Sequence, residues 1–242
     1  MRREDKLWGG YSLLQDDRFF KLGQDSILLS DFAAPPAGGQ VLDLGCGNGA
    51  LCVLLCARFA RLKVTGLEIQ PQLAQLAREN AEHNRIADRM TVVEGDLKQH
   101  KKLFENRKFD YIICNPPYFV QGSGYSADGA QRRGAREEEH CTMEDAIRAA
   151  GFLVKFGGRA AFVHRPERLA ESMAAFRAAG LEPKRLRFVH QRASAVPSVV
   201  LIEARKGSAP GLSVLPPLLV CREDGSHTDE YRSIYHRDEY ET

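Results

Sequence analysis

The feature that most constrains the fold is an alternation of short apolar or β-branched runs with segments of helical spacing. The runs that we predict to be strands lie at residues 41–45, 63–68, 90–94, 109–114, 159–164, 185–189 and 197–204. Helical segments lie between them, at residues 50–59, 71–84, 142–155 and 166–179. Strands that alternate with helices are typical of βαβ units, in which helices cover both faces of a largely parallel sheet. We therefore predict an α/β fold.

A glycine-rich turn follows the first of these strands and has the sequence Asp43-Leu44-Gly45-Cys46-Gly47-Asn48-Gly49. Glycine is needed where a tight turn brings the backbone close to a ligand at the start of a helix. The spacing Gly-x-Gly-x-Gly differs from the Gly-x-Gly-x-x-Gly of dinucleotide-binding folds. Asp43, at the strand end, can face the cationic part of an amino acid. The alternative is a βα turn that binds nothing.

Two further acids follow the next two predicted strands. Glu68 ends the second strand, about 20 residues after the glycines, where a carboxylate can accept hydrogen bonds from both ribose hydroxyls. Asp96 follows the third strand and can hold an adenine amine. Either acid alone is more typical of a solvated loop. Together they lie at the edge where open α/β sheets bind ligands, and their neighbours Ile69 and Leu97 belong to the same predicted site.

The fourth predicted strand leads directly into Asn115-Pro116-Pro117-Tyr118. Consecutive prolines fix the backbone and donate no hydrogen bond, so the adjacent carbonyl groups are held in place without a partner in the sheet. A planar amine needs two acceptors and a surface to lie on. The Asn115 side chain and the Pro116 carbonyl can accept, and Tyr118 can stack on a base. A rigid turn with a surface tyrosine is the alternative interpretation.

Residues 43–49, with Glu68 and Asp96, resemble the cofactor signature of the class I S-adenosylmethionine-dependent methyltransferases. The resemblance extends from about residue 23 to residue 204. It implies a Rossmann-like fold, with a seven-stranded, mostly parallel sheet and one antiparallel strand near its end, and S-adenosylmethionine as the cofactor. The implied cofactor-binding residues within this stretch are Asp25, Ser26, Asp43, Gly45, Cys46, Gly47, Asn48, Gly49, Glu68, Ile69, Asp96, Leu97 and Asn115.

The motif after the fourth strand resembles that of methyltransferases acting on amino groups of adenine, cytosine, guanine or glutamine. This implies direct in-line transfer of a methyl group to nitrogen, with Asn115, Pro116, Pro117 and Tyr118 as the catalytic residues. The first two would orient the amine and stabilise the positive charge that develops on it. Aligning two bound reactants lowers the activation barrier by about 7–11 kcal/mol. Neither a metal nor a cysteine nucleophile is then required.

The stretch from Phe20 to Ser30 resembles the segment before the first strand in the bacterial tRNA(Val) adenine N6-methyltransferase family. In that family the segment closes over the methionine end of the cofactor, which makes Asp25 and Ser26 candidates. The run 115–119, the pair Arg136-Glu137 and the tail 231–235 also resemble this family. The implied substrate is the adenosine just after the anticodon of a tRNA.

Aromatic and basic residues near the motif favour a nucleic acid as the substrate. The predicted substrate-binding residues are Tyr118, Phe119, Arg132, Arg133 and Arg136, the last three in a long irregular loop at 121–139. Arginines there can contact phosphates. A second basic cluster consists of Lys184, Arg185, Arg187, His190 and Arg192, and it is equally typical of a solvated face.

Other functions explain less of the sequence. A ribosomal guanine or a protein glutamine methyltransferase has the same tetrapeptide, but the glutamine enzyme normally has a helical domain first, and only about 40 residues precede Val41. A nicotinamide-dependent dehydrogenase would leave the Asn115 motif unexplained. A non-catalytic RNA-binding protein would leave the strand-end acids unexplained.

Length and composition place these motifs in a single domain over residues 1–242. We divide it into an N-terminal cofactor-covering segment (1–38), a core (39–206) that includes the loop 121–139, and a tail (207–242). The net charge of +2 is almost uninformative about partners. The cysteines lack zinc-ligand spacing, and no apolar run is long enough for a membrane span. We therefore expect a cytoplasmic monomer that binds neither metal nor membrane.

Overall fold

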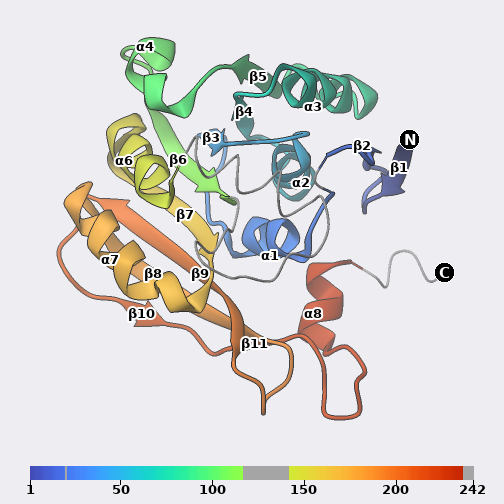
Figure 1. Ribbon diagram of the computed structural model, residues 1–242, viewed down its shortest axis with the longest axis vertical. Helices are drawn as coiled ribbons and strands as arrows, with labels where there is room; N and C mark the ends of the chain where they lie inside the picture. The colour runs from blue at the N-terminus through green and yellow to red at the C-terminus, as the bar shows by residue number, and fades with distance from the viewer. Residues whose placement is uncertain (20, 117–141, 237–242) are drawn as a thin grey trace.

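The computed structural model describes residues 1–19, 21–116 and 142–236 (Figure 1). The strands are β1 (Arg2–Lys6), β2 (Ser12–Asp16), β3 (Gln40–Leu44), β4 (Lys63–Glu68), β5 (Met90–Glu94), β6 (Phe109–Cys114), β7 (Val154–His164), β8 (Leu181–His190), β9 (Pro197–Lys206), β10 (Ser213–Val214) and β11 (Leu218–Leu219). The α-helices are α1 (Gln24–Phe32), α2 (Ala50–Arg58), α3 (Pro71–His83), α4 (His100–Phe104), α6 (Met143–Leu153), α7 (Leu169–Ala178) and α8 (Asp229–Ile234), with short 3₁₀ turns at Leu97–Gln99 and Pro166–Arg168.

The central sheet has the strand order β10-β8-β9-β7-β6-β3-β4-β5, and β11 also pairs with β8. All neighbours are parallel except β9, which runs antiparallel to both β7 and β8. This confirms the predicted α/β class and its antiparallel strand near the end. The prediction of seven strands was wrong: in the described part of the chain the sheet has nine. The two additional strands are only two residues long, come from the tail, and lie parallel to β8.

The core forms two layers because alternate residues of a strand point to opposite faces of the sheet. Val41 and Tyr111 pack with α1 and α2 on one face. Their immediate neighbours, Leu42 and Ile112, pack with α6 and α7 on the other. Strands buried on both faces are apolar nearly throughout, which is why β3 and β6 were recognisable as short continuous runs. Helices therefore cover both faces, as predicted.

The predicted starts of two strands, β7 and β8, were wrong. The helix predicted over 142–155 ends at Leu153, and β7 begins at Val154, because Val154 pairs with Phe109 of β6. The strand predicted over 185–189 is twice as long, from Leu181 to His190, because it pairs along almost all of β9. The start of α6 was predicted correctly, since Thr142 caps it.

The N-terminal segment contains an antiparallel hairpin, β1–β2, that was not predicted. The C-terminal segment returns to it. His236, just after α8, stacks on Trp8 in the hairpin turn with ring centroids 4.5 Å apart. Arg58, at the end of α2, lies over the same indole ring at 4.6 Å and donates a hydrogen bond to the Ile234 carbonyl at 2.6 Å. Residues from both ends of the described sequence therefore meet beside α2.

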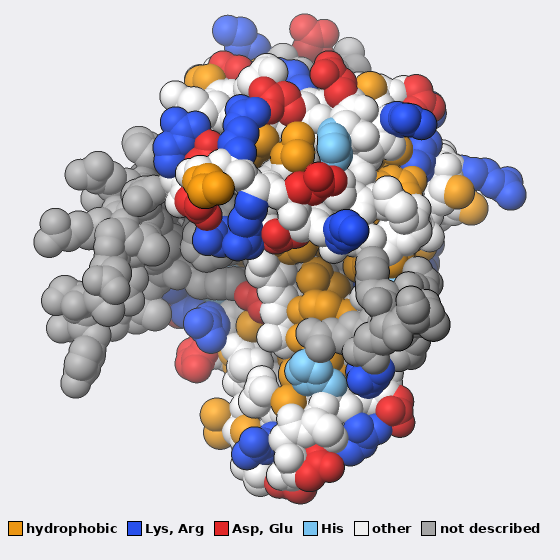
Figure 2. All heavy atoms as spheres, turned by 90° about the vertical axis from the view of Figure 1, so that its right-hand side faces the viewer, with side chains coloured by type: hydrophobic (Ala, Val, Ile, Leu, Met, Phe, Trp, Pro, Cys, Tyr) orange, Lys and Arg blue, Asp and Glu red, His pale blue; other side chains and the backbone are white. Residues whose placement is uncertain are grey.

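Charged side chains of both signs are interspersed on the face that carries the hairpin and α8 (Figure 2). This agrees with the net charge of +2. Over the described ranges, no helix has the length and apolar character needed to cross a membrane.

Candidate functional site

The glycine-rich turn lies at the carboxyl end of β3, where it is fixed by backbone hydrogen bonds. The N–H groups of Gly45 and Cys46 both donate to the Leu67 carbonyl at 2.9 Å, which ties the turn to the neighbouring strand β4. Gly45, Gly47 and Gly49 have φ angles of 75°, 56° and 80°. Residues with a Cβ are strained in this left-handed region, so the turn requires glycine.

The glycines face two different environments. A methyl group built on Gly45 or Gly47 would meet no atom of the described residues within 4 Å. A methyl group on Gly49 would lie 2.6 Å from Met90 Cε and 3.0 Å from Ala77 Cβ. Gly49 thus allows α3 and β5 to pack closely against the turn, whereas the first two glycines leave open space next to their backbone. This space suits a ligand that approaches the main chain.

Glu68, at the end of β4, is buried with 5% of its surface exposed. Its carboxylate accepts hydrogen bonds from the Gly47 N–H at 2.9 Å and from the Gln70 N–H at 2.8 Å. The acid therefore lies directly against the glycine-rich turn, as the strand-end argument predicted. The role in binding ribose hydroxyls stays a prediction.

Asp43 is also buried, with 2% of its surface exposed. Burial raises its pKa to about 7; the Cys52 thiol, which donates to Asp43 Oδ2 at 3.4 Å, opposes the rise, and the nearby charge of Glu68 adds to it. An aspartate with this pKa carries a partial charge near neutral pH. A cation bound beside it would favour the charged form.

The three remaining predicted residues of this edge lie on the β4 and β5 loops. Asp96 is half-buried and caps the 3₁₀ turn, because its Oδ1 accepts from the Lys98 N–H at 2.8 Å. Leu97 is buried, and Ile69 is 47% exposed. Ile69 follows Glu68 directly and is one of the few large apolar side chains that are exposed in the described part of the chain. An exposed apolar side chain beside a buried acid offers a surface on which a flat ring of a ligand can pack.

Asn115 follows β6 and is joined to the N-terminal segment. Its Nδ2 donates a hydrogen bond to Ser26 Oγ at 3.0 Å. Ser26 is buried in α1, and Asp25 beside it is half-buried. Pro116 is buried as well. The structure thus brings together two predicted site residues that are far apart in sequence.

The other predicted residues of the substrate site, Pro117, Tyr118, Phe119, Arg132, Arg133 and Arg136, lie outside the described residues. Two residues of the second basic cluster, Lys184 and Arg187, bind the tail. Lys184 donates to the Ala209 carbonyl at 3.2 Å, and Arg187 donates to the Pro216 carbonyl at 3.0 Å and pairs with Glu230. These side chains therefore have a structural role.

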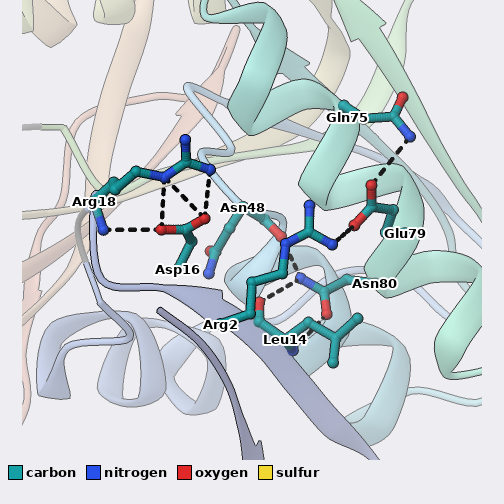
Figure 3. A network of polar contacts seen from close by, with 8 residues as sticks. All are labelled: Arg2, Leu14, Asp16, Arg18, Asn48, Gln75, Glu79 and Asn80. Atoms are coloured by element: carbon teal, nitrogen blue, oxygen red, sulfur yellow. Dashed lines mark hydrogen bonds and ion pairs between the residues drawn. The ribbon is translucent and has the colours of Figure 1, made fainter.

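One residue of this region was not predicted. Asn80, on α3, is completely buried and donates a hydrogen bond to the Asn48 carbonyl of the glycine-rich turn at 2.9 Å (Figure 3). No signal in the sequence marks it beyond its place on the inner face of a helix. Within the described ranges, no cluster of histidine, cysteine, aspartate or glutamate side chains has the arrangement of a metal site.

Comparisons with known proteins give a consistent result. The model of the methyltransferase small domain family matches residues 23–163. A protein of Porphyromonas gingivalis named tRNA1(Val) (adenine(37)-N6)-methyltransferase is 35% identical over 157 residues, and one of Vibrio vulnificus with the same name is 31% identical over 153. The matches cover 62% and 63% of this chain and 61% and 62% of those relatives, so the chain matches about three fifths of their length.

Two solved structures show the fold. A predicted O-methyltransferase from Agrobacterium tumefaciens superposes with a TM-score of 0.72 at 24% identity, covering 88% of this chain and 96% of that one. A 16S rRNA N2 G1207 methyltransferase of T. thermophilus, in complex with AdoMet and guanosine, superposes with a TM-score of 0.58 at 22% identity, covering 85% and 50%.

Proposed function

Because the chain belongs to the methyltransferase small domain family, we propose that it transfers the methyl group of S-adenosylmethionine to the N6 amine of an adenine in tRNA. The observation that carries the proposal is the convergence of Asp43, Glu68 and Asn115 at one edge of the sheet, around the glycine-rich turn. The names of the relatives, which specify a tRNA adenine N6-methyltransferase, support the choice of substrate.

The residues around the turn fit S-adenosylmethionine. The open space beside Gly45 and Gly47 leaves room for a ligand against the backbone. Glu68 supplies a buried carboxylate for the ribose hydroxyls, Asp96 an acceptor for the adenine amine, and Asp43 a negative charge for the ammonium group. When bound, the cofactor supplies a methyl group on a sulfonium, which a neutral amine can attack.

Asn115 orients the amine. Because its Nδ2 donates to Ser26, the amide group has a fixed direction, and its Oδ1 can accept a hydrogen bond from the target amine. The Pro116 carbonyl, which precedes a residue without an N–H, is the second acceptor. Two acceptors direct the nitrogen lone pair and stabilise the positive charge that develops on the nitrogen. The proton then leaves to solvent, so no general base is assigned.

The remaining parts of the proposal concern the RNA. We assign stacking on the target base to Tyr118 and Phe119, a contact worth about 1–3 kcal/mol per base, and phosphate contacts to Arg132, Arg133 and Arg136. A stacked adenine must turn out of the helix to reach the site. We further propose that the chain acts as a single-domain monomer in the cytoplasm, on the adenosine that follows the anticodon.

The test is methyl transfer from labelled cofactor to separate fractions of tRNA, ribosomal RNA and protein, followed by nucleoside analysis. We expect label in N6-methyladenosine of tRNA. A transcript in which guanosine replaces the adenosine after the anticodon is the matched control and should take up no label. Label only in protein, or only in guanosine, would overturn the proposed substrate.

A further inference from the structure

Asn80 connects three segments that are distant in sequence (Figure 3). Its Oδ1 accepts from the Leu14 N–H at 2.7 Å, and its Nδ2 donates to the Leu14 carbonyl at 3.0 Å. The same Nδ2 donates to the Asn48 carbonyl at 2.9 Å. Asn80 is 0% exposed, so each of these groups would lack water as an alternative partner. The side chain therefore joins α3, β2 and the glycine-rich turn.

Asn84, four residues later and directly after the end of α3, binds β2 in the same way but has no hydrogen bond to the glycine-rich turn. Its Oδ1 accepts from the Ser12 N–H at 2.8 Å, and its Nδ2 donates to the Ser12 carbonyl at 2.7 Å. Asn80 and Asn84 are four residues apart, and the residues of β2 that they bind, Leu14 and Ser12, are two apart. One turn of helix thus spans roughly the same distance as two residues of the strand. The two amides take the place of a neighbouring strand on the edge of β2 that faces away from β1.

The contact with Asn48 restricts the glycine-rich turn at a position between two glycines. Asn48 lies between Gly47 and Gly49, which both have positive φ angles, and glycine has more backbone freedom than any other residue. A hydrogen bond to the Asn48 carbonyl fixes the orientation of the peptide group between Asn48 and Gly49. Ala77, on the same face of α3, packs against Gly49. The helix therefore holds the turn at two adjacent points.

We propose that Asn80 is a positioning residue for the cofactor: it holds the glycine-rich turn in its binding conformation and couples the turn to the N-terminal hairpin. The inference rests on the proposed function, since it assumes that the turn binds S-adenosylmethionine. Leu14 of β2 supports the turn only through the Asn80 side chain, which it holds by two hydrogen bonds.

The experiment compares Asn80→Ala with Asn84→Ala, which removes two equivalent bonds to Ser12 of β2 and one to the Asn80 backbone carbonyl, and leaves the turn untouched. Cofactor affinity is measured by isothermal titration with S-adenosylmethionine, and stability by urea unfolding. We expect both variants to be destabilised, whereas only Asn80→Ala raises the Kd, by about tenfold, the effect of one buried hydrogen bond. In the transfer assay its KM for the cofactor should rise in parallel, with kcat within about threefold of wild type.

The outcomes separate the two proposals. Wild-type protein that does not bind S-adenosylmethionine would overturn the proposed function. Wild-type binding together with equal Kd values for the two alanine variants would overturn only the role of Asn80, because the loss would then follow from the hairpin alone. Should Asn80→Ala fail to fold, Asn80→Ser, with its smaller change in polarity, takes its place in the same comparison.

Discussion

The Asn115 side chain donates to Ser26 Oγ across 3.0 Å, which joins the end of β6 to the first turn of α1. The residue that we assign to amine orientation is thus held by the N-terminal segment. Asn115, which we propose to be catalytic, is thus hydrogen-bonded to the segment proposed to cover the cofactor. A change in α1 should therefore alter how the target amine is oriented.

Replacement of Asn115 by alanine should reduce methyl transfer by about 100-fold, the typical effect of removing one group that stabilises developing charge. Cofactor affinity should stay within about threefold of wild type, because the acids that we propose to bind the cofactor are unchanged. Single-turnover transfer and isothermal titration measure the two effects. Asn106→Ala, in the exposed loop before β6, is the control and should change neither. Wild-type turnover by Asn115→Ala would contradict the orientation role.

Glu68→Gln should raise the Kd for S-adenosylmethionine at least about tenfold, because a charged acceptor for hydroxyl groups becomes a neutral one. Isothermal titration measures the change. Glu94 is the matched control: it pairs in register with Glu68 at the end of the adjacent strand β5 but is exposed. Glu94→Gln should bind the cofactor like wild type. Equal losses in both variants would show that the buried carboxylate has no specific role.

Asp43 should make stability depend on pH. Its pKa is about 7 in the folded chain and near 3.8 when the side chain is exposed. The folded chain thus holds the proton more tightly, and ionisation of Asp43 destabilises the fold increasingly as pH rises from about 4 to about 7. Relative to wild type, Asp43→Asn should gain up to about 4 kcal/mol of unfolding free energy across this range. Urea unfolding at pH 4.5, 6 and 8 measures it; a constant difference between the two proteins would refute it.

Arg58 should contribute strongly to stability although it lies outside the candidate site. Its side chain is only 10% exposed, lies over Trp8, pairs with Asp31 at 3.2 Å, and donates to Ser30 and Ile234. Arg58→Ala should cost about 2–3 kcal/mol of unfolding free energy. The control is Arg61→Ala, at an exposed position three residues later, which should cost less than about 0.5 kcal/mol. Similar losses in both variants would contradict this assignment.

The sequence was sufficient to predict the seven long strands of the central sheet, but not the short strands at its edge or the separate N-terminal hairpin. Buried strands such as β6 are apolar and bounded by breakers, so periodicity identifies them. β1 (Arg2–Lys6) consists of charged residues only, and no pattern distinguishes it from a loop. Its partner β2 is held by Asn80 and Asn84 from a helix far along the chain, and local sequence does not encode such contacts. The same applies to β10 and β11, which are too short to show any alternation.

For the candidate site, the ends of the parallel strands show in the sequence which residues reach this edge of the sheet, and Glu68 does lie against the glycine-rich turn there. The contacts that hold these residues in place do not show in the sequence. Ser26 was a candidate only through family resemblance, and its bond to Asn115 depends on the path of α1 over the sheet. The raised pKa of Asp43 follows from burial, which only the packed structure reveals.

The stacking of His236 on Trp8 has a consequence for how the protein is made. During translation the hairpin and α2 leave the ribosome early, whereas α8 and His236 emerge almost 180 residues after Arg58. Closing so long a stretch of chain is slow compared with forming local contacts. The region beside α2 can therefore be completed only after synthesis has reached α8. Until then Trp8 lacks the His236 ring that stacks on it, and Arg58 lacks the Ile234 carbonyl that accepts its hydrogen bond.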